Sequence, residues 1–484
     1  MKKFWAVLLS VFVFGLSVCF VSCKNLSTGR TKYNIECYLS DDMCLTGVET
    51  VEFYNQSDLT FDELKFNLYG NAFRKDAKFS PISNQYIANA YPHGKSYGEM
   101  SILSVKEKGK PVEFLVEGQD KNLLTVKLLS EVYPEETATL EIEFTLKLAN
   151  VIARTGYNDK TVNLGNFYPV LCVYDGGFYE CNYYSSGDPF YSECADYQVK
   201  FTLNKDFVVA GGGKKLSEKV DGENKVHTFS LTNARSFALV LSKEFKVKNL
   251  THNGIMINYY YYDDQTPDKS VEYIVKSLDL FSNKFGEYAY SDYSVVQTKF
   301  VQGGMEYPTL VMISDELEPN AYGEVIVHET AHQWWQSAVG NNEIEHAFLD
   351  EGLAEYSVVI FYENHPEYQM GRKFMIASAE QTYKTYCTVY DKIFGKVDTS
   401  MIRKLCDFDS EYEYVNIAYV KACLMFEHLR TTIGEERFFS GLKRYYKNYK
   451  YKIATPDDLT GAFEKVGSDT NGFFNSFFSG KVIL

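Results

Sequence analysis

The hydrophobic period of this sequence changes once along the chain, and no other feature constrains the fold as much. From about residue 33 to residue 244, apolar residues alternate with polar ones in short runs, and in 140–148 the alternation is complete. A period of two is typical of antiparallel strands that bury one face, and no long helical pattern interrupts it. We therefore predict an antiparallel β-sandwich-like domain over residues 33–244.

The period lengthens after residue 244. In 271–285 the apolar residues recur at spacings of three and four, and Gly286 follows, which predicts an amphipathic helix. Strands are predicted at 294–300 and 310–313, with mostly helices after them. A chain of 484 residues is also too long for one hydrophobic core. We therefore expect a multidomain α+β protein, whose second domain is mixed α/β and covers residues 245–484.

The amino terminus has the pattern of an export signal. Lys2 and Lys3 precede an almost unbroken apolar stretch over 4–20, as in secretory signal peptides. The next residues, Phe20-Val21-Ser22-Cys23, resemble a bacterial lipobox, in which the cysteine is lipidated after cleavage.

We therefore expect residues 1–23 to be a signal peptide of lipoprotein type, Cys23 to carry a lipid anchor, and residues 24–32 to be a short tether. The protein would then be exported to the cell envelope and associate with a membrane surface without spanning it. Two alternatives stay open. Plain cleavage would give a soluble secreted or periplasmic protein, and an uncleaved apolar stretch of about 19 residues would span the membrane once.

Charge and cysteine content exclude two other classes of protein. The formal net charge of −15 argues against a nucleic-acid partner, because binding phosphates needs a basic face. The chain has ten cysteines, two of them in the signal region, which are too few for disulfide bonds to be the main support of a fold of this length. No C-x-x-C pair indicates a thiolate metal site. Disulfide pairing and oligomeric state do not follow from the sequence.

The sequence His328-Glu329-Thr330-Ala331-His332 is an H-E-x-x-H motif. It lies in a segment without proline, 321–338, which ends near Gly340 and is predicted to be helical. Side chains four residues apart project from one face of a helix, so both imidazoles can bind one ion. Zn²⁺ accepts imidazole nitrogen and carboxylate oxygen, and a catalytic site leaves its fourth position to water. The motif therefore predicts one zinc ion per chain, held by His328, His332 and a third ligand.

Glu351 is the candidate for that third ligand. It stands 19 residues after His332, in a stretch over 348–362 that again has helical character. A second, antiparallel helix would bring its carboxylate back beside the two histidines. Glu329 directly follows a ligand and lies to the side of the ligand face, where it can accept a proton from water at the open position. We expect Glu329 to be the general base.

The motif, its continuation to Trp335 and the distance to Glu351 resemble the gluzincin zinc aminopeptidases of the aminopeptidase N and leukotriene hydrolase type. The sequence Gly303-Gly304-Met305-Glu306-Tyr307 is similar to the G-x-M-E-N exopeptidase signature of this family. Further similarity covers the catalytic-tyrosine helix and parts of the amino-terminal domain, at 419–422, 429–430, 434–438, 165–169 and 237–240. The resemblance thus extends over nearly the whole mature chain, and it implies a thermolysin-like catalytic domain.

The resemblance also implies a role for each matching residue. In the family, the glutamate that matches Glu306 pairs with the free α-ammonium of a peptide substrate. Backbone groups that match Gly303, Gly304 and Met305 line the substrate, and the tyrosine that matches Tyr419 donates its hydroxyl to the oxyanion. The expected partners are therefore peptides with a free amino terminus.

Two departures from the family leave alternatives open. Tyr307 replaces the family's asparagine, and the chain ends at Leu484, 65 residues after Tyr419, so the large helical domain of many relatives is expected to be absent. The cleft would then be more open, or covered by a second subunit, which suits an endopeptidase of the same chemistry. A catalytically silent peptide-binding module is the third hypothesis. The complete set of ligands, base and tyrosine argues against the silent module, and of the two enzymes we favour the aminopeptidase.

Overall fold

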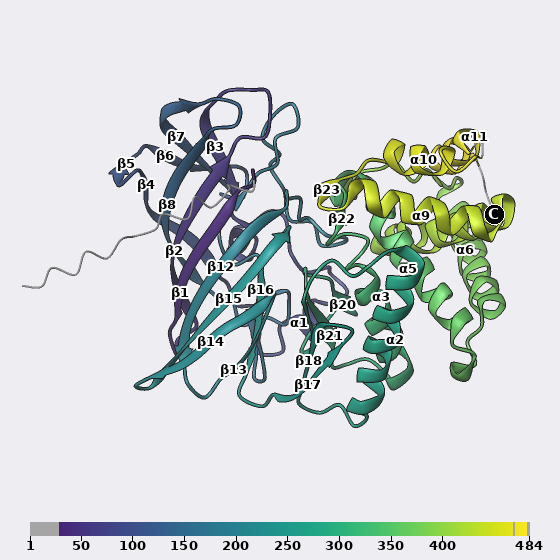
Figure 1. Ribbon diagram of the computed structural model, residues 1–484, viewed down its shortest axis with the longest axis horizontal. Helices are drawn as coiled ribbons and strands as arrows, with labels where there is room; N and C mark the ends of the chain where they lie inside the picture. Colours follow the sequence, from purple (N-terminus) through teal and green to yellow (C-terminus); the bar gives the residue numbers. More distant parts are fainter. Residues whose placement is uncertain (1–28, 468–469, 482–484) are drawn as a thin grey trace, which may run out of the picture.

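The computed structural model describes residues 29–467 and 470–481. The predicted signal peptide, the lipid anchor at Cys23 and most of the tether lie outside these residues. A strand-rich amino-terminal part and a helix-rich carboxy-terminal part lie side by side (Figure 1). This is the multidomain α+β fold that the change of period predicted.

The largest sheet of the amino-terminal part has eight strands, in the order β14-β15-β12-β1-β2-β8-β4-β5. Their bounds are β14 Lys214–Asp221, β15 Asn224–Ala234, β12 Ala195–Asn204, β1 Lys32–Leu39, β2 Cys44–Tyr54, β8 Thr137–Lys147, β4 Glu99–Glu107 and β5 Lys110–Pro111. β1 and β12 run parallel, and the other neighbours are antiparallel. Buried residues alternate with partly exposed ones along β8, as the period of two predicted.

Two smaller sheets complete this part. One has the order β13-β16-β10-β9, with bounds Val208–Gly211, Ala238–Ser242, Val162–Gly165 and Thr155–Tyr157. The other has the order β11-β3-β7-β6, with bounds Val170–Leu171, Phe61–Asn67, Leu123–Val132 and Phe114–Glu117. A 3₁₀ helix at Tyr69–Phe73 and the short α1 (Ile87–Ala90) connect strands. One hydrophobic core joins all three sheets, so the sandwich-like arrangement is confirmed.

The second part is built on a five-stranded sheet in the order β17-β18-β19-β21-β20. The bounds are β17 Lys246–His252, β18 Ile255–Tyr261, β19 Asp292–Thr298, β21 Leu310–Ser314 and β20 Gly304–Met305. β18, β19 and β21 are parallel, and β20 is an antiparallel edge strand. The predicted domain boundary near residue 244 falls between β16 and β17.

Helices lie on the side of this sheet away from the amino-terminal domain and continue to the end of the described chain (Figure 1). They are α2 Pro267–Phe285, α3 Pro319–Ala331, α4 Glu343–His346, α5 Phe348–Asn364, α6 Arg372–Phe394, α7 Glu411–Tyr414, a π-helix Val415–Lys421, α8 Ala422–Ile433, α9 Glu435–Tyr449, α10 Pro456–Glu464 and α11 Asn471–Phe478. Two 3₁₀ helices at Pro366–Tyr368 and Leu405–Asp407, and the strand pair β22 (Val339–Gly340) and β23 (Lys452–Ile453), lie between them. Within the described residues, none of the helices combines the length and the apolar character needed to cross a bilayer.

The helix predicted over 321–338 is shorter at its carboxyl end than expected. α3 begins at Pro319, where proline suits the first helical turn, and ends at Ala331 with His332 as its C-cap. The chain then turns so that Trp334 and Trp335 enter the core, where they are 0% and 1% exposed. Trp334 packs against Phe281 of α2, and Trp335 against Phe285. The burial of the two indole rings therefore ends the helix at a residue that composition alone does not predict.

One buried arginine ties the two parts together. Arg235 follows β15 and is 4% exposed. Its guanidinium donates to the carbonyl oxygens of Ser192, Gln336 and Lys452, so it joins the amino-terminal domain to the segment after α3 and to β23. Gly340 leaves room for it, since a Cβ at that position would lie 2.0 Å from the guanidinium carbon.

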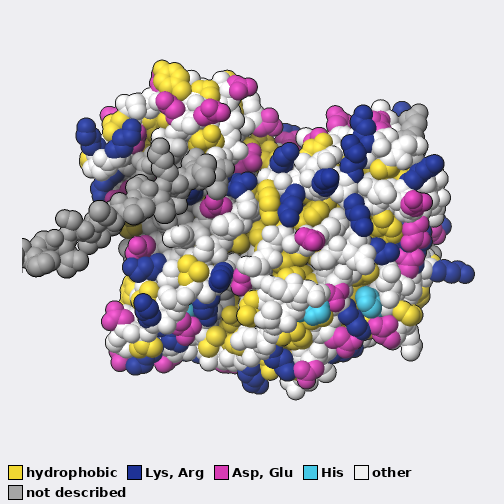
Figure 2. All heavy atoms as spheres, viewed as in Figure 1, with side chains coloured by type: hydrophobic (Ala, Val, Ile, Leu, Met, Phe, Trp, Pro, Cys, Tyr) yellow, Lys and Arg dark blue, Asp and Glu magenta, His cyan; other side chains and the backbone are white. Residues whose placement is uncertain are grey.

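Acidic and basic side chains are interspersed over both domains on the face drawn in Figure 2. Exposed ion pairs such as Lys200–Glu36, at 2.9 Å, contribute little to stability.

Candidate active site and metal centre

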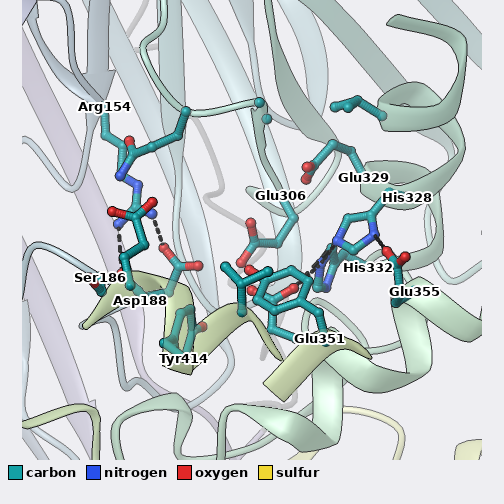
Figure 3. A pocket seen from close by; sticks show the side chains of 18 of the residues that line it. Arg154, Ser186, Asp188, Glu306, His328, Glu329, His332, Glu351, Glu355 and Tyr414 are labelled. Carbon is teal, nitrogen blue, oxygen red and sulfur yellow. Dashed lines mark hydrogen bonds and ion pairs between the residues drawn. The ribbon is translucent and has the colours of Figure 1, made fainter. Parts of the chain in front are cut away.

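A cavity of about 380 Å³ opens between the two domains. The amino-terminal domain contributes Tyr86, Arg154 and residues 185–188 to its lining. The second domain contributes residues from the β20 strand, α3, α5, α7 and the π-helix, and the predicted site residues are among them. Figure 3 shows how their side chains face one another.

Two histidines and one glutamate converge at one end of this cavity. His328 is in the last turn of α3, His332 caps that helix, and Glu351 is in the first turn of α5. The Nε2 atoms of the two histidines lie 3.1 Å apart, and Glu351 Oε2 lies 3.4 Å from His328 Nε2 and 3.2 Å from His332 Nε2. The structure therefore brings together the three ligands predicted from spacing.

Packing of α3 against α5 produces this convergence. Trp335, just after α3, donates from Nε1 to Ser357 Oγ of α5 at 3.2 Å. Thr330 Oγ1 and Tyr293 Oη lie 2.9 Å apart, which joins α3 to β19. Gly352 lets α5 approach the next helix layer, because a Cβ there would lie 2.3 Å from the Ala422 Cβ.

The donor atoms fit a zinc ion. His332 Nδ1 lies 2.9 Å from the Trp335 carbonyl oxygen, and His328 Nδ1 lies 3.3 Å from Glu355 Oε2. Both acceptors hold the proton on Nδ1, which leaves the Nε2 lone pair of each ring directed at the common point. Two imidazole nitrogens and one carboxylate oxygen are a donor set that zinc accepts, with a position left for water.

The charges of these groups reinforce one another. Burial lowers the pKa of His328, but its contacts with Glu351 and Glu355 outweigh burial and raise that pKa to about 10, so a metal ion has to displace the Nε2 proton when it binds this ring. Burial raises the pKa of Glu351, yet the two histidines outweigh it and hold that pKa well below its usual value. Glu351 therefore stays ionised, as a metal ligand must.

Glu329 lies beside the ligands and is 5% exposed. Burial raises the pKa of Glu329, and the nearby charges of His328 and His332 offset part of that rise. The resulting pKa is about 7. A carboxylate with a pKa near neutrality is suited to accept and return a proton. Its Oε2 has no hydrogen-bond partner among the described residues, and a Cβ on Gly304 would lie 2.2 Å from its Oε1. The glycine at 304 therefore provides the space that this carboxylate occupies.

The predicted substrate-binding residues divide into two groups. Gly303, Gly304 and Glu306 line the cavity, and Glu306 is 3% exposed. The Met305 side chain is 1% exposed and packs into the core of the amino-terminal domain, so it anchors the strand from behind. Tyr307, the departure from the family signature, also points into that domain, where a Cβ on Gly165 would lie 1.8 Å from its hydroxyl.

Tyr419 lies on the π-helix and lines the cavity. Its ring stacks on His328, with centroids 5.9 Å apart and an interplanar angle of 12°. Burial, followed by the nearby charge of Glu351, raises the pKa of its hydroxyl well above the usual value. The hydroxyl therefore keeps its proton and can donate it in a hydrogen bond. π-helical turns are frequent at functional sites.

Sequence reasoning did not assign Arg154, Asp188 or Tyr414, which also line the cavity. Arg154 Nη2 and Asp188 Oδ1 form a buried ion pair at 2.5 Å (Figure 3). The turn composition of 185–189 predicts a loop, but no local signal shows that the loop reaches a catalytic centre in another domain. Glu355, four residues after Glu351 on α5, lies beside His328.

Two histidines from one helix and a glutamate from the next, on this two-domain fold, define a gluzincin type of metal centre. Residues 269–477 match the family described as Peptidase family M1 domain. The match covers most of the second domain, which is therefore similar to the catalytic domain of that family.

Several relatives resemble parts of this chain. It is 24% identical over 291 residues to "Aminopeptidase M1" of Arabidopsis thaliana, covering 56% of this chain and 32% of that protein. It is 22% identical over 412 residues to "Aminopeptidase 2" of Candida albicans, covering 77% of this chain and 41% of that protein. The chain therefore spans less than half the length of these two relatives.

Solved structures share the fold over a larger part of their length. The crystal structure of an M1 zinc metallopeptidase from Deinococcus radiodurans has a TM-score of 0.68 and 16% sequence identity. The match covers 94% of this chain and 95% of that chain. The two-domain architecture described here is therefore that of a known M1 structure.

The contact between Glu355 and His328 leads to a test of the metal centre. We expect Glu355→Ala to weaken zinc binding by roughly tenfold to a hundredfold, because His328 loses the group that orients it. Competition with a chromophoric chelator measures the affinity. Glu363→Ala, two turns further along α5, is the matched control and should retain the original affinity. Equal affinities in the two variants would show that Glu355 does not orient the ligand.

Proposed function

We propose that this protein is a zinc-dependent aminopeptidase that hydrolyses the amino-terminal residue from peptides. One observation carries the proposal: a single cavity holds three zinc donors, a carboxylate with a pKa near 7, a protonated tyrosine and the buried Glu306. The names of the relatives, which are aminopeptidases, support it.

His328, His332 and Glu351 would hold one zinc ion per chain. When bound, the ion supplies Lewis acidity, which polarises a carbonyl group and makes water more acidic. This is the chemistry that hydrolysis of an unactivated peptide bond requires.

Glu329 moves the proton. Its carboxylate accepts a proton from the attacking water and passes it to the nitrogen of the departing peptide. The Tyr419 hydroxyl donates a hydrogen bond to the carbonyl oxygen as negative charge develops on that atom, and a fixed donor of this kind typically contributes about 3 kcal/mol. The two residues thus serve opposite sides of the bond that breaks.

Glu306 fixes where the chain begins. A buried carboxylate that faces the cavity favours a cationic group, and the free α-ammonium of a peptide supplies one. A crystal structure of a point mutant of the Deinococcus radiodurans M1 zinc metallopeptidase contains the substrate Tyr-Ser-Ala. We infer that peptides with a free amino terminus are the substrates of this protein as well.

The role of Glu329 gives the central test. We expect Glu329→Gln to lower kcat for aminoacyl-arylamides by about a thousandfold or more, because the amide cannot accept the proton. Zinc content, measured by plasma mass spectrometry, should equal that of the wild type. Retained hydrolysis would reject the assignment of the base. A wild-type protein purified without zinc and without activity would instead support the silent binding module.

The endopeptidase hypothesis is tested by blocking the substrate. Acetylation removes the positive charge that Glu306 pairs with, so kcat/KM for an acetylated peptide should fall by about a hundredfold or more relative to the free peptide. Mass spectrometry of the products also shows which bond is cut. Undiminished cleavage of the acetylated peptide at an internal bond would establish an endopeptidase.

We further propose that the protein is exported and held at a membrane surface through Cys23, on the basis of the apolar stretch and lipobox-like sequence at 1–23. Labelled fatty acid should be incorporated into the wild type in bacterial cells and not into Cys23→Ala. Equal labelling of both would reject the anchor, and a lack of label in both would favour the soluble secreted form.

A further inference from the structure

Glu324 lies on the cavity side of α3, one turn before His328, and has no role in the reaction described above. Its side chain is partly exposed, and it makes no hydrogen bond or ion pair within residues 29–467 and 470–481. Burial raises the pKa of Glu324, and so does the nearby charge of Glu355, while His328 lowers it. This carboxylate therefore faces the substrate cavity with its hydrogen-bonding capacity unused.

Glu324 and Glu306 lie on opposite sides of the metal centre. An oxygen of Glu306 lies within 4.8 Å of a nitrogen of His332. Glu355, the acidic neighbour of Glu324, contacts His328 instead, at 3.3 Å. In Figure 3, Glu306 and Glu355 lie on opposite sides of His328. Glu324 is therefore on the side of the metal centre that faces away from the amino end of a bound peptide.

The edge strand β20 indicates the path of the peptide beyond the metal. A Cβ on Gly304 would lie 2.2 Å from Glu329 Oε1, and a Cβ on Gly303 would lie 3.6 Å from Val325 Cγ2. Backwards along this strand, the facing positions of α3 thus move towards the start of the helix. A helix rises about 6 Å over four residues, which is close to the length of two residues of an extended chain. A peptide whose amino end is held as proposed above, and which extends along β20, therefore places its second residue beside Val325 and Glu324.

The surroundings of Glu324 suit a long cationic side chain. Ala321, one turn earlier on α3, and Val325 also line the cavity. A small residue and an apolar one can pack against the methylene groups of lysine or arginine, whose charged end then reaches the carboxylate. Arg154 is the only lysine or arginine among the described residues that line the cavity, and it pairs with Asp188, at 2.5 Å. The lining itself therefore supplies no lysine or arginine that competes for Glu324.

We propose that Glu324 selects peptides whose second residue is lysine or arginine, by pairing its carboxylate with the cationic end of that side chain. The inference rests on the proposed aminopeptidase function, and it adds a preference for the residue that follows the bond that is cut. Because Glu324 is partly exposed, we expect the pair to change kcat/KM by about tenfold.

The experiment compares tetrapeptides on the zinc-loaded full-length protein. Leu-Lys-Ala-Ala and Leu-Met-Ala-Ala have second side chains of similar length, and of these two side chains only lysine is charged. Mass spectrometry of the released leucine gives kcat/KM for each peptide. We expect the wild type to favour the lysine peptide by about tenfold, and Glu324→Gln to cleave both at about the same rate. Glu324→Lys should reverse the preference, so that Leu-Glu-Ala-Ala is cleaved faster than Leu-Lys-Ala-Ala.

The control lies on the same helix. Glu318, the N-cap residue of α3, is exposed, makes no capping hydrogen bond with its side chain and does not line the cavity. Glu318→Gln removes the same charge as Glu324→Gln and should keep the wild-type preference. A second control moves the lysine, because Leu-Ala-Lys-Ala places it one residue beyond the position that Glu324 is proposed to contact. This peptide should be favoured over Leu-Ala-Met-Ala by less than about twofold.

The outcomes separate this inference from the proposed function. Equal kcat/KM for the lysine and methionine peptides in the wild type would overturn the inference, and so would a tenfold preference that survives in Glu324→Gln or is lost equally in Glu318→Gln. If the wild type releases leucine from none of the peptides, the proposed function fails instead. Calorimetry then decides the inference, because the Kd ratio of the two peptides on the wild type and on Glu324→Gln reports the pairing without turnover. Equal Kd values on the wild type would overturn it.

Discussion

The convergence of α3 and α5 is the constraint on which the site depends. Two imidazoles on one helix end can be specified locally, but a third donor must arrive from elsewhere, and Glu351 does so because α5 packs against α3. Trp334 and Trp335 hold that packing. They end α3 at Ala331, and both side chains are buried. Trp334 Nε1 donates a hydrogen bond to the Gly286 carbonyl oxygen, and Trp335 Nε1 donates one to Ser357 Oγ. The metal centre is therefore set by apolar burial, since the hydrogen bonds of its own ligands are too few to position two helices.

The amino-terminal domain packs beside the second domain and also forms part of the cavity that holds the candidate active site. It contributes Arg154 and Asp188 to the cavity, and its core receives the side chains of Met305 and Tyr307. The substrate-lining strand β20 is therefore held from behind by a different domain, with Arg235 as a buried link between the two. The wall at the Glu306 end of the cavity is acidic, which supports the proposed preference for substrates with a free amino terminus.

Some parts of this structure followed from local pattern. The alternation in 140–148 predicted β8, and the spacing of apolar residues before Gly286 predicted α2, because one buried face imposes its period on the sequence. The H-E-x-x-H spacing predicted His328, His332 and Glu329 as neighbours for the same reason. The end of α3 was placed seven residues too late, at 338 instead of 331, because the turn after His332 is driven by tertiary burial of the two tryptophans. The inward direction of Met305 was also not predictable, since it depends on which domain lies behind β20.

The sequence by itself determined the change from strands to helices and the pair of histidines on one helix face, because periodicity and short-range spacing act through residues close along the chain. It offered Glu351 as a candidate third ligand, and the packing of α5 on α3 brought that carboxylate to the histidines. Only the tertiary structure decided that Asp188, Glu306 and Glu343, separated by 118 and 37 residues, meet in one buried cluster with a single arginine. Contacts of that kind depend on how separate elements pack, so no local pattern of residue types predicts them.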